Sequence, residues 1–340
     1  MNRFGARLGL GLVLAFSIQG CGGDGASSSA APQQPSAIVL SLTNLRALDP
    51  IAEGSYQAWL VTSGQPTSLG RFAGAQSVTL AVSTRISDGA ELWITVEPPG
   101  GGSASVTPSA QQLLRGAFRG GVADLSLVGA VTQGTLSLRQ RPGQFTMFTP
   151  SDNALDGYPS HEESGVWLFN MAPRATDQND MWVRLTQLDP GWTYEGWMVR
   201  DIGQPNAIWL SYGKFAPDYT GAVNSRDDTG WGPFSGVVNY KTDGEEEFPG
   251  DDWISNPLNL SFPKDLTLPL NLRETTSSGT QRWTHVITIE PAFDRGEPVG
   301  SARPFLLQPY RDPFGMGAPG EARTITFHPE TLPSGRAETK

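Results

Sequence analysis

The sequence predicts an all-β protein made of two tandem Ig-like antiparallel β-sandwich units, the second of which carries a long acidic insertion. Three observations lead to this class. Glycine and proline account for 40 and 27 of the 340 residues, which is typical of chains with many turns and few long helices. Short segments that alternate apolar and polar residues recur between turn-forming residues. One set of residues in the first half recurs in the same order in the second half.

The repeated set joins turn residues to aromatic residues. Each copy has an Asp-Pro turn, a Tyr and a Trp three residues apart, a Gly-Gln-Pro turn, a Gly-Arg/Lys-Phe segment and a Glu-Pro strand end. Its marker residues are Tyr56, Trp59 and Glu97 in the first copy and Tyr194, Trp197 and Glu290 in the second. We expect the rings to fill a sandwich core, and the alternative is a platform that stacks a ligand. Each glutamate is either a buried carboxylate bound by backbone N–H groups or a solvated charge at a strand end.

The first 21 residues have the pattern of a bacterial lipoprotein signal peptide. Arg3 and Arg7 give a positive start, and residues 8–18 form an apolar run that is short for a membrane span. The run ends in Ile18-Gln19-Gly20-Cys21, an aliphatic and a small residue in the spacing that precedes a lipidated cysteine. Cys21 is the only cysteine of the chain, and we expect it to be lipidated. The alternative is an ordinary secretory signal.

Residues 22–36 contain mainly Gly, Ser, Ala, Gln and Pro, which predicts a flexible tether between the lipid anchor and the folded part. Gly22 stands where an inner-membrane retention signal would have aspartate, which favours the outer membrane. We therefore expect the protein in the bacterial cell envelope, outside the cytoplasm, with the membrane as a partner through its lipid anchor.

Unit 1 is predicted over residues 37–139. The apolar residues of its first segment alternate with polar ones, as Ile38, Leu40 and Leu42 show. The expected strands cover residues 37–45, 56–61, 67–72, 77–82, 90–97, 113–118, 122–128 and 135–139. Residues 109–115 are the one segment that admits a helical turn or two. Short strands at this spacing are typical of an antiparallel sandwich or barrel.

A polar stretch with several prolines, residues 140–162, is predicted to be a linker. Unit 2 follows over residues 163–329, and residues 330–340 are predicted to be a tail. The expected strands of unit 2 cover residues 164–169, 181–188, 193–199, 208–215 and 283–290. An insertion of about residues 216–280 separates the last two of these strands.

The insertion is acidic and contains aromatic residues, and long insertions on β scaffolds often carry function. The candidate binding residues are Asp227, Asp228, Trp231, Asp243, Glu245, Asp251, Asp252 and Trp253. Clustered carboxylates could hold Ca²⁺, which prefers six to eight oxygen ligands, although no EF-hand spacing is present. Carboxylates beside exposed rings could also bind a carbohydrate. A third interpretation is a solvated loop that packs its rings on its own sandwich.

Nucleic-acid binding and catalysis have little support in the sequence. The net charge is −10, whereas a surface that binds a duplex is basic. The three histidines are His161, His285 and His328, and neither a His-Glu-x-x-His nor a Gly-x-Ser-x-Gly motif occurs. We therefore expect no enzyme and no cofactor, with calcium as the alternative. A periplasmic hydrolase would need an acid–base pair in one cleft, and Glu97 and Glu290 belong to different units.

Several motifs resemble the extracytoplasmic β domain of anti-sigma-K-type anti-sigma factors. They are Leu-Asp-Pro followed by Tyr-Gln-Ala-Trp-Leu-Val at 56–61 or by Tyr-Glu-Gly-Trp-Met-Val at 194–199. Ser-Gly-Val-Trp at 164–167 and Phe-Pro-Gly-Asp-Asp at 248–252 are similar to motifs of uncharacterised bacterial lipoproteins. The resemblance covers most of residues 37–128 and 163–310.

The resemblance implies a β domain that faces the cell envelope. The chain shows no cytoplasmic sigma-binding segment, no zinc-binding Cys/His set and no transmembrane helix, so we do not expect it to sequester a sigma factor. We expect a non-catalytic binding, sensing or scaffold role, with an envelope protein or a glycan as the unidentified partner. The alternative is a calcium-dependent or carbohydrate-binding surface protein.

Overall fold

The computed structural model describes residues 36–100, 103–128, 144–149, 151–152, 161–168, 185, 188–216, 226–227, 234–235, 241–242, 246–247, 249–292, 304–313 and 318–340. The chain divides into two compact parts, Met1–Gln34 and Pro35–Lys340, and all of these residues belong to the second. The all-β prediction is confirmed, because every sheet in this part is antiparallel. Within the described residues, no helix is long and apolar enough to cross a membrane.

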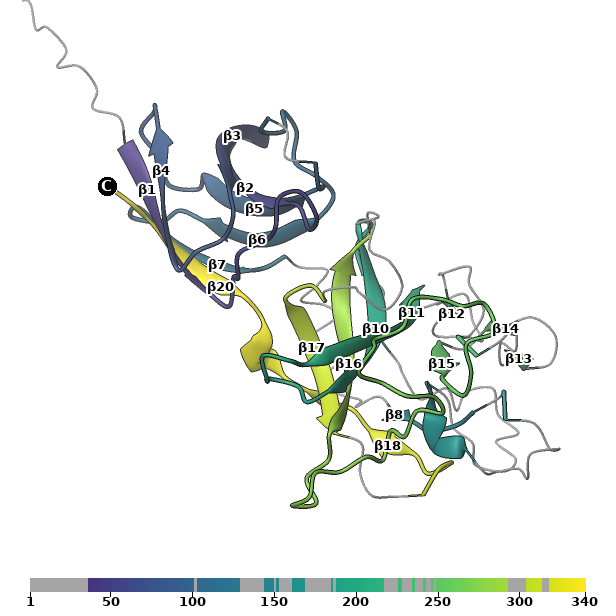
Figure 1. Cartoon of the computed structure of the whole chain (residues 1–340). Coiled ribbons are helices and arrows are strands. Elements are labelled where there is room, and N and C mark those ends of the chain that lie inside the picture. Colours follow the sequence, from purple (N-terminus) through teal and green to yellow (C-terminus); the bar gives the residue numbers. More distant parts are fainter. Residues whose placement is uncertain are drawn as a thin grey trace, which may run out of the picture. The chain divides into compact units, whose positions relative to one another are not determined.

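The first sheet has eight strands in the order β3-β2-β5-β6-β7-β20-β1-β4 (Figure 1). Its strands are β1 (Ser36–Thr43), β2 (Ser55–Thr62), β3 (Gln65–Phe72), β4 (Ser77–Val82), β5 (Glu91–Glu97), β6 (Gln112–Ala117), β7 (Val122–Leu127) and β20 (Ser334–Thr339). The first seven match predicted strands closely. The eighth predicted strand, residues 135–139, lies outside the described residues. The helical turn considered for residues 109–115 is wrong, because β5 offers this segment a partner strand and β6 forms on it.

The alternating pattern of β1 has the predicted effect on its burial. Ile38, Leu40 and Leu42 are buried in the core, whereas Ser41 faces solvent. β7 joins the two layers of the sheet, since its first four residues pair with β20 and its last two pair with β6. The strands β4-β1-β20-β7 and β3-β2-β5-β6 therefore form two layers with the apolar residues between them.

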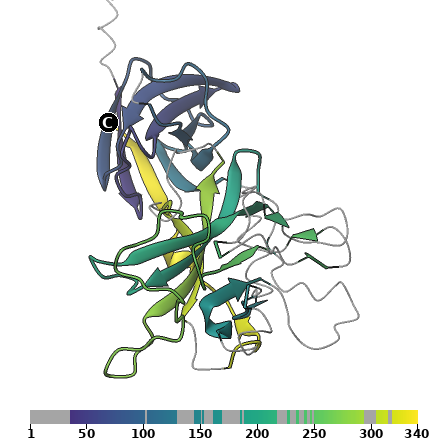
Figure 2. The ribbon, with the colours of Figure 1, turned by 45° about the vertical axis from the view of Figure 1, so that its right-hand side comes forward.

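The prediction that residues 330–340 are a tail is wrong. Six residues of this segment form β20, which lies between β1 and β7 in the first sheet. Figure 2 shows β20 in yellow beside β1 in purple, with the C-terminus next to the first strand. Ala337 is fully buried, and its neighbours Arg336 and Glu338 point away from the core. Alternation over only six polar-rich residues is too weak a signal to identify a strand from sequence.

The second sheet has six strands in the order β12-β11-β10-β16-β17-β19 (Figure 1). These are β10 (Trp192–Arg200), β11 (Ile208–Ala216), β12 (Arg226–Asp227), β16 (Trp283–Pro291), β17 (Leu307–Pro313) and β19 (Thr326–Phe327). Three small sheets pair β8 (Gln144–Phe145) with β18 (Arg323–Thr324), β9 (Gly165–Trp167) with β15 (Gly250–Asp252), and β13 (Lys241–Thr242) with β14 (Glu246–Glu247). Two 3₁₀ turns are η1 (Glu162–Ser164) and η2 (Pro329–Thr331).

The interpretation of residues 140–162 as a linker is also wrong for the part that the structure describes. Phe145 and Met147 are fully buried, and Thr146 exchanges backbone hydrogen bonds with Trp167. Most of the predicted strand at residues 181–188 lies outside the described residues.

The repeated sequence set takes the same form in both sheets. The four strands β3-β2-β5-β6 correspond to β11-β10-β16-β17 in order and direction. Each copy has a β-bulge at the same place, with Leu69 as the extra residue of β3 and Tyr212 as the extra residue of β11. Most buried apolar residues of both sheets belong to one continuous cluster, and Trp197, Val199 and Val286 form a smaller one.

Candidate functional site

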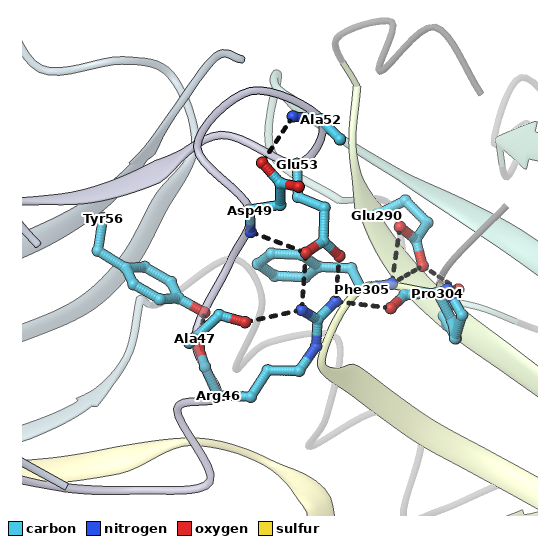
Figure 3. Close-up of polar contacts among 10 residues, drawn as sticks. Arg46, Ala47, Asp49, Ala52, Glu53, Tyr56, Glu290, Pro304 and Phe305 are labelled. Atoms are coloured by element: carbon cyan, nitrogen blue, oxygen red, sulfur yellow. Dashed lines mark hydrogen bonds and ion pairs between the residues drawn. The ribbon is translucent and has the colours of Figure 1, made fainter. Parts of the chain in front are cut away.

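Arg46 lies in the loop after β1 and forms a hydrogen bond to the segment that leads into β17 (Figure 3). Its guanidinium donates hydrogen bonds to both carboxylate oxygens of Glu53, at 2.6 and 3.0 Å. It also donates to the carbonyl oxygens of Ala47 and Pro304, each at 3.0 Å. Burial lowers the pKa of Arg46, but the Glu53 carboxylate more than offsets this effect and the net shift is upward. The guanidinium therefore stays charged.

The loop before β2 holds Glu53 in place. Glu53 is 2% exposed and accepts a hydrogen bond from the backbone N–H of Asp49 at 3.0 Å. The Asp49 carboxylate accepts the N–H groups of Ile51 and Ala52, which forms a tight turn. The Tyr56 hydroxyl donates to the carbonyl oxygen of Arg46 at 3.0 Å. These hydrogen bonds hold the loop and the Arg46 side chain in one arrangement.

Glu290 fixes the other side of the contact. Its carboxylate accepts the backbone N–H of Phe305, at 2.8 and 3.1 Å from the two oxygens. The neighbouring carbonyl of Pro304 is the one that Arg46 contacts, as Figure 3 shows. Arg46 in the loop after β1 and Glu290 in the second sheet thus bind neighbouring backbone groups, the carbonyl of Pro304 and the N–H of Phe305.

A groove of about 1030 Å³ opens beside Arg46. It is lined by the end of β1, the two residues before β4, the start of β20, and the β17 and η2 region. The lining residues are Ser41, Leu42, Thr43, Asn44, Leu45, Arg46, Ala75, Gln76, Leu306, Gln308, Thr331, Ser334, Gly335 and Arg336. Leu42, Leu45 and Leu306 are buried and form its apolar floor. Its size is at the upper end of the range for small-ligand sites.

The groove is polar but nearly neutral. Its two cations are Arg46, which is paired with Glu53, and Arg336, which lies 3.1 Å from Glu338 and 3.4 Å from Asp124. The other polar lining groups are hydroxyls and side-chain amides, and no aromatic ring or carboxylate is among the described lining residues. This arrangement suits a ligand that exchanges neutral hydrogen bonds, such as an extended backbone, better than a sugar ring that stacks on an aromatic residue.

The first copy of the repeat contains a buried hydrogen-bond chain. Trp59 Nε1 donates to Thr95 Oγ1 at 2.9 Å, and Thr95 donates to Glu97 at 2.5 Å. Glu97, which is 2% exposed, also accepts the Ser105 hydroxyl at 2.7 Å and the Ser109 backbone N–H at 3.3 Å. The burial of Glu97 does not fit a solvated charge at a strand end.

The second copy has the same chain. Trp197 Nε1 donates to Thr288 Oγ1 at 2.9 Å, and Thr288 donates to Glu290 at 2.5 Å. Glu290 is fully buried, and the backbone N–H that it accepts comes from Phe305. In both copies the carboxylate anchors the chain that follows its strand, so its role in the structure is to hold that segment.

The repeated rings do not form a surface platform. The Tyr56 ring is tilted against Phe72 with ring centres 5.5 Å apart, and Tyr194 stacks on Phe215 at 5.8 Å. Both tyrosines belong to the main core, whereas Trp197 lies in a smaller cluster on the opposite face of its sheet. All four marker rings, those of Tyr56, Trp59, Tyr194 and Trp197, are 0% exposed. A ligand could not stack on them without local unfolding.

The acidic insertion is described only in part. Asp228, Trp231, Asp243 and Glu245 lie outside the described residues, and Asp227 is described by its backbone in β12 alone. Asp252 and Trp253 are fully buried in and beside β15, so neither faces solvent. Asp251 accepts the N–H of Asp252 at 2.7 Å as well as the N–H of Phe234. The described end of the insertion is thus part of the packed structure.

The Asp252 carboxylate is buried close to Ser151, Ser235 and Asp152. Its carboxylate accepts the backbone N–H of Ser151 at 3.0 Å. Burial raises the pKa of Asp252, and the nearby Asp152 carboxylate adds to this effect. Within the described part of the chain, no group of three or more His, Cys, Asp or Glu residues is arranged to hold a metal ion. The calcium prediction therefore depends on residues outside those described.

His285 on β16 is buried between aromatic rings. The Tyr212 hydroxyl lies 2.9 Å from its Nε2 atom, and the Phe145 ring contacts it edge-on with ring centres 4.3 Å apart. Burial lowers the pKa of His285 to about 3. The imidazole is therefore neutral in the folded protein at ordinary pH.

We expect His285 to make the protein acid-sensitive. Above a pH of about 6.5 the imidazole is neutral in both states and has no effect on the pH dependence. Between pH 6.5 and 3 the unfolded chain binds a proton at this imidazole that the folded chain does not. The free energy of unfolding therefore falls by about 1.4 kcal/mol for each unit by which the pH is lowered. Urea unfolding of wild type and His285→Gln at several pH values between 7.5 and 4.5 measures this effect. In the variant, the free energy of unfolding should depend less steeply on pH, by about 1.4 kcal/mol per pH unit. Equal slopes for the two proteins would contradict the low pKa of His285.

Sequence reasoning missed Arg46, Glu53 and the groove. A weak signal for the first two exists, because the loop from the Asp-Pro turn to the tyrosine is two residues longer in the first copy, where Glu53 lies. The groove has no such signal, because β20 and β17, which line it, were not predicted as strands. Cys21 lies outside the described residues.

Comparison with known protein families gives a match over part of the chain. Residues 18–112 match the family described as anti-sigma-K factor rskA, C-terminal. This segment includes β1 to β5 and the loop that carries Arg46 and Glu53. No curated protein and no solved structure matches the chain.

Proposed function

We propose, with the similarity of residues 18–112 to the C-terminal part of anti-sigma-K factors as the premise, that this chain is a lipid-anchored bacterial envelope protein that binds a partner outside the cytoplasm. The role is regulatory or structural and not catalytic. The anchor is Cys21, which follows an apolar run and the Ile18-Gln19-Gly20 pattern. Several acyl chains on one residue give firm membrane attachment.

The groove beside Arg46 is the observation that supports a binding role. It is large and open, it combines an apolar floor with hydroxyl and amide groups, and its arginines are already neutralised by carboxylates. Its walls come from strands far apart in the sequence, and the Arg46 network fixes the loop at one side. A surface built in this way can recognise a partner without a large change of shape.

Two readouts in intact cells test the proposal. Cys21→Ser should leave the protein folded and move it from the membrane pellet to the soluble fraction after a salt wash. In the lipidated protein, a photo-crosslinking residue at Gln76 in the groove should give a discrete adduct. The matched control is the same residue at Ser277, which is exposed in a hairpin away from the groove. Membrane retention of the Cys21→Ser protein would refute the anchor, and equal adducts at both positions would refute the groove as the binding surface.

A further inference from the structure

β4 is the last strand of the first sheet, and among the residues that the structure describes no strand pairs with its outer edge. Its six residues pair with β1 in an uninterrupted register from Ser36 opposite Val82 to Ser41 opposite Ser77. Beyond this register, Leu42 donates its N–H to the carbonyl of Gln76 at 2.8 Å. In an antiparallel pair the hydrogen-bonded positions alternate, so Val78, Leu80 and Val82 direct their backbone groups toward β1.

The intervening residues Ser77, Thr79 and Ala81 direct their N–H and C=O groups away from β1. None of these groups has a backbone hydrogen bond in the described part of the chain. All three residues are exposed, and their side chains are small. They therefore form a straight row of donors and acceptors that another extended backbone can approach closely.

The other sheet edges that the structure describes are shorter or blocked. β3 contains Pro66 and Arg71 and carries the bulge at Leu69, while β12 and β19 have two residues each. Natural proteins protect exposed edges with charges, prolines, bulges or short strands, because unprotected edges pair with other chains. β4, with the sequence Ser-Val-Thr-Leu-Ala-Val, has none of these devices.

We propose that an extended segment of a partner polypeptide adds to the free edge of β4 as a further strand and continues into the groove beside Arg46. Ala75 and Gln76, which directly precede β4, line this groove, so the edge and the groove form one surface. The inference rests on the proposed binding role and names the class of ligand. Backbone hydrogen bonds to Ser77, Thr79 and Ala81 supply affinity, and the hydroxyl and amide groups of the groove supply selectivity.

A partner segment fits this edge better than a second copy of the chain. The edge is uncharged and places no demand on the charge of its ligand, whereas each copy carries a net charge of −10 and repels another. A glycan could form hydrogen bonds with the hydroxyl and amide groups of the groove. It would not match the row of backbone donors and acceptors along β4.

The test uses the mature protein and a defined peptide probe, obtained by selecting a display library of random ten-residue peptides on the immobilised protein. Thr79→Pro removes one outward N–H and keeps the ladder to β1, since that N–H points away from β1. Thr79→Val is the matched control, because it changes the side chain and keeps the N–H. We expect Thr79→Pro to lower the affinity of the protein for the selected peptides at least tenfold. Thr79→Val should change this affinity less than twofold.

Hydrogen exchange on the wild type gives a second test that does not depend on how the proline variant folds. The amides of Ser77, Thr79 and Ala81 should exchange rapidly in the free protein and slow down when the peptide binds. The inference is overturned if no peptide is selected, if bound peptides leave these amides unprotected, or if sedimentation shows a wild-type dimer that Thr79→Pro dissociates. If a Gln76 adduct forms in cells and any of these results is also obtained, the proposed function is supported and only the addition of a strand to β4 is refuted.

Discussion

Deletion of residues 334–340 is expected to unfold the first sheet. β20 pairs with β1 over six residues and with β7 over four, so its loss leaves one edge of β1 unpaired and leaves β7 with only its two residues opposite β6. Each hydrogen bond contributes about 1 kcal/mol, and about ten of them equal the whole stability of a typical domain, which is 5–15 kcal/mol. Loss of the buried Ala337 also opens the core. We expect the truncated chain to lose its cooperative thermal transition or to be recovered as aggregates.

A synthetic peptide of residues 330–340 provides the control for this deletion. Added during refolding, it should restore the transition, since the gap between β1 and β7 is specific for this strand. Glu338→Ser, which alters an outward side chain of β20 and keeps its backbone, should melt within a few degrees of wild type. A truncated chain with the melting temperature of the full one would show that β20 is dispensable.

The second large effect is expected for Gly196→Ala on β10. A Cβ atom on this residue would overlap the Tyr212 side chain, whose Cζ, Cε2 and hydroxyl oxygen are its three nearest atoms. Tyr212 is 4% exposed and tied to His285, so it cannot move aside freely. Overpacking of this kind destabilises a protein by about 3 kcal/mol or more. Urea unfolding of the purified variant measures the loss.

The first copy of the repeat shows how the same site accepts an alanine. There the residues that correspond to Gly196, Tyr212 and His285 are Ala58, Leu69 and Leu92. The triple variant with alanine, leucine and leucine at the three positions of the second copy should therefore recover most of the stability that Gly196→Ala loses. If Gly196→Ala unfolds at the same urea concentration as wild type, the close contact with Tyr212 is not present in solution.

The strands that could be predicted from sequence are those with strong alternation and turn residues at both ends. β2 is an example, because Tyr56, Ala58 and Leu60 occupy every second position between two turns, and Ser63-Gly64 has the positive φ angles of a tight hairpin. β6 was less clear, since Leu113 and Leu114 are adjacent and both buried, a pattern that suits a helical turn equally well. Only pairing with β5 decides between the two.

The candidate site could not be predicted because it depends on contacts between distant residues. Arg46 and Pro304 are 258 positions apart, and β20 reaches β1 across nearly the whole chain. The acidic insertion was a reasonable candidate on composition, but composition does not show that Asp252 and Trp253 point into the interior. The sequence shows the aromatic markers of the repeat as a set, whereas their hydrogen-bond chains through Thr95 and Thr288 become visible only in three dimensions.

The position of β20 also determines when the protein can finish folding. Ile38 is opposite Thr339, so the first sheet takes its eighth strand from a segment that follows the whole second sheet in the sequence. Pairings between such distant positions form slowly, because the intervening chain must first be brought together. A chain that is made from its N-terminus therefore carries β1 and β7 with open edges until β20 has been made, and the first sheet stays incomplete until then.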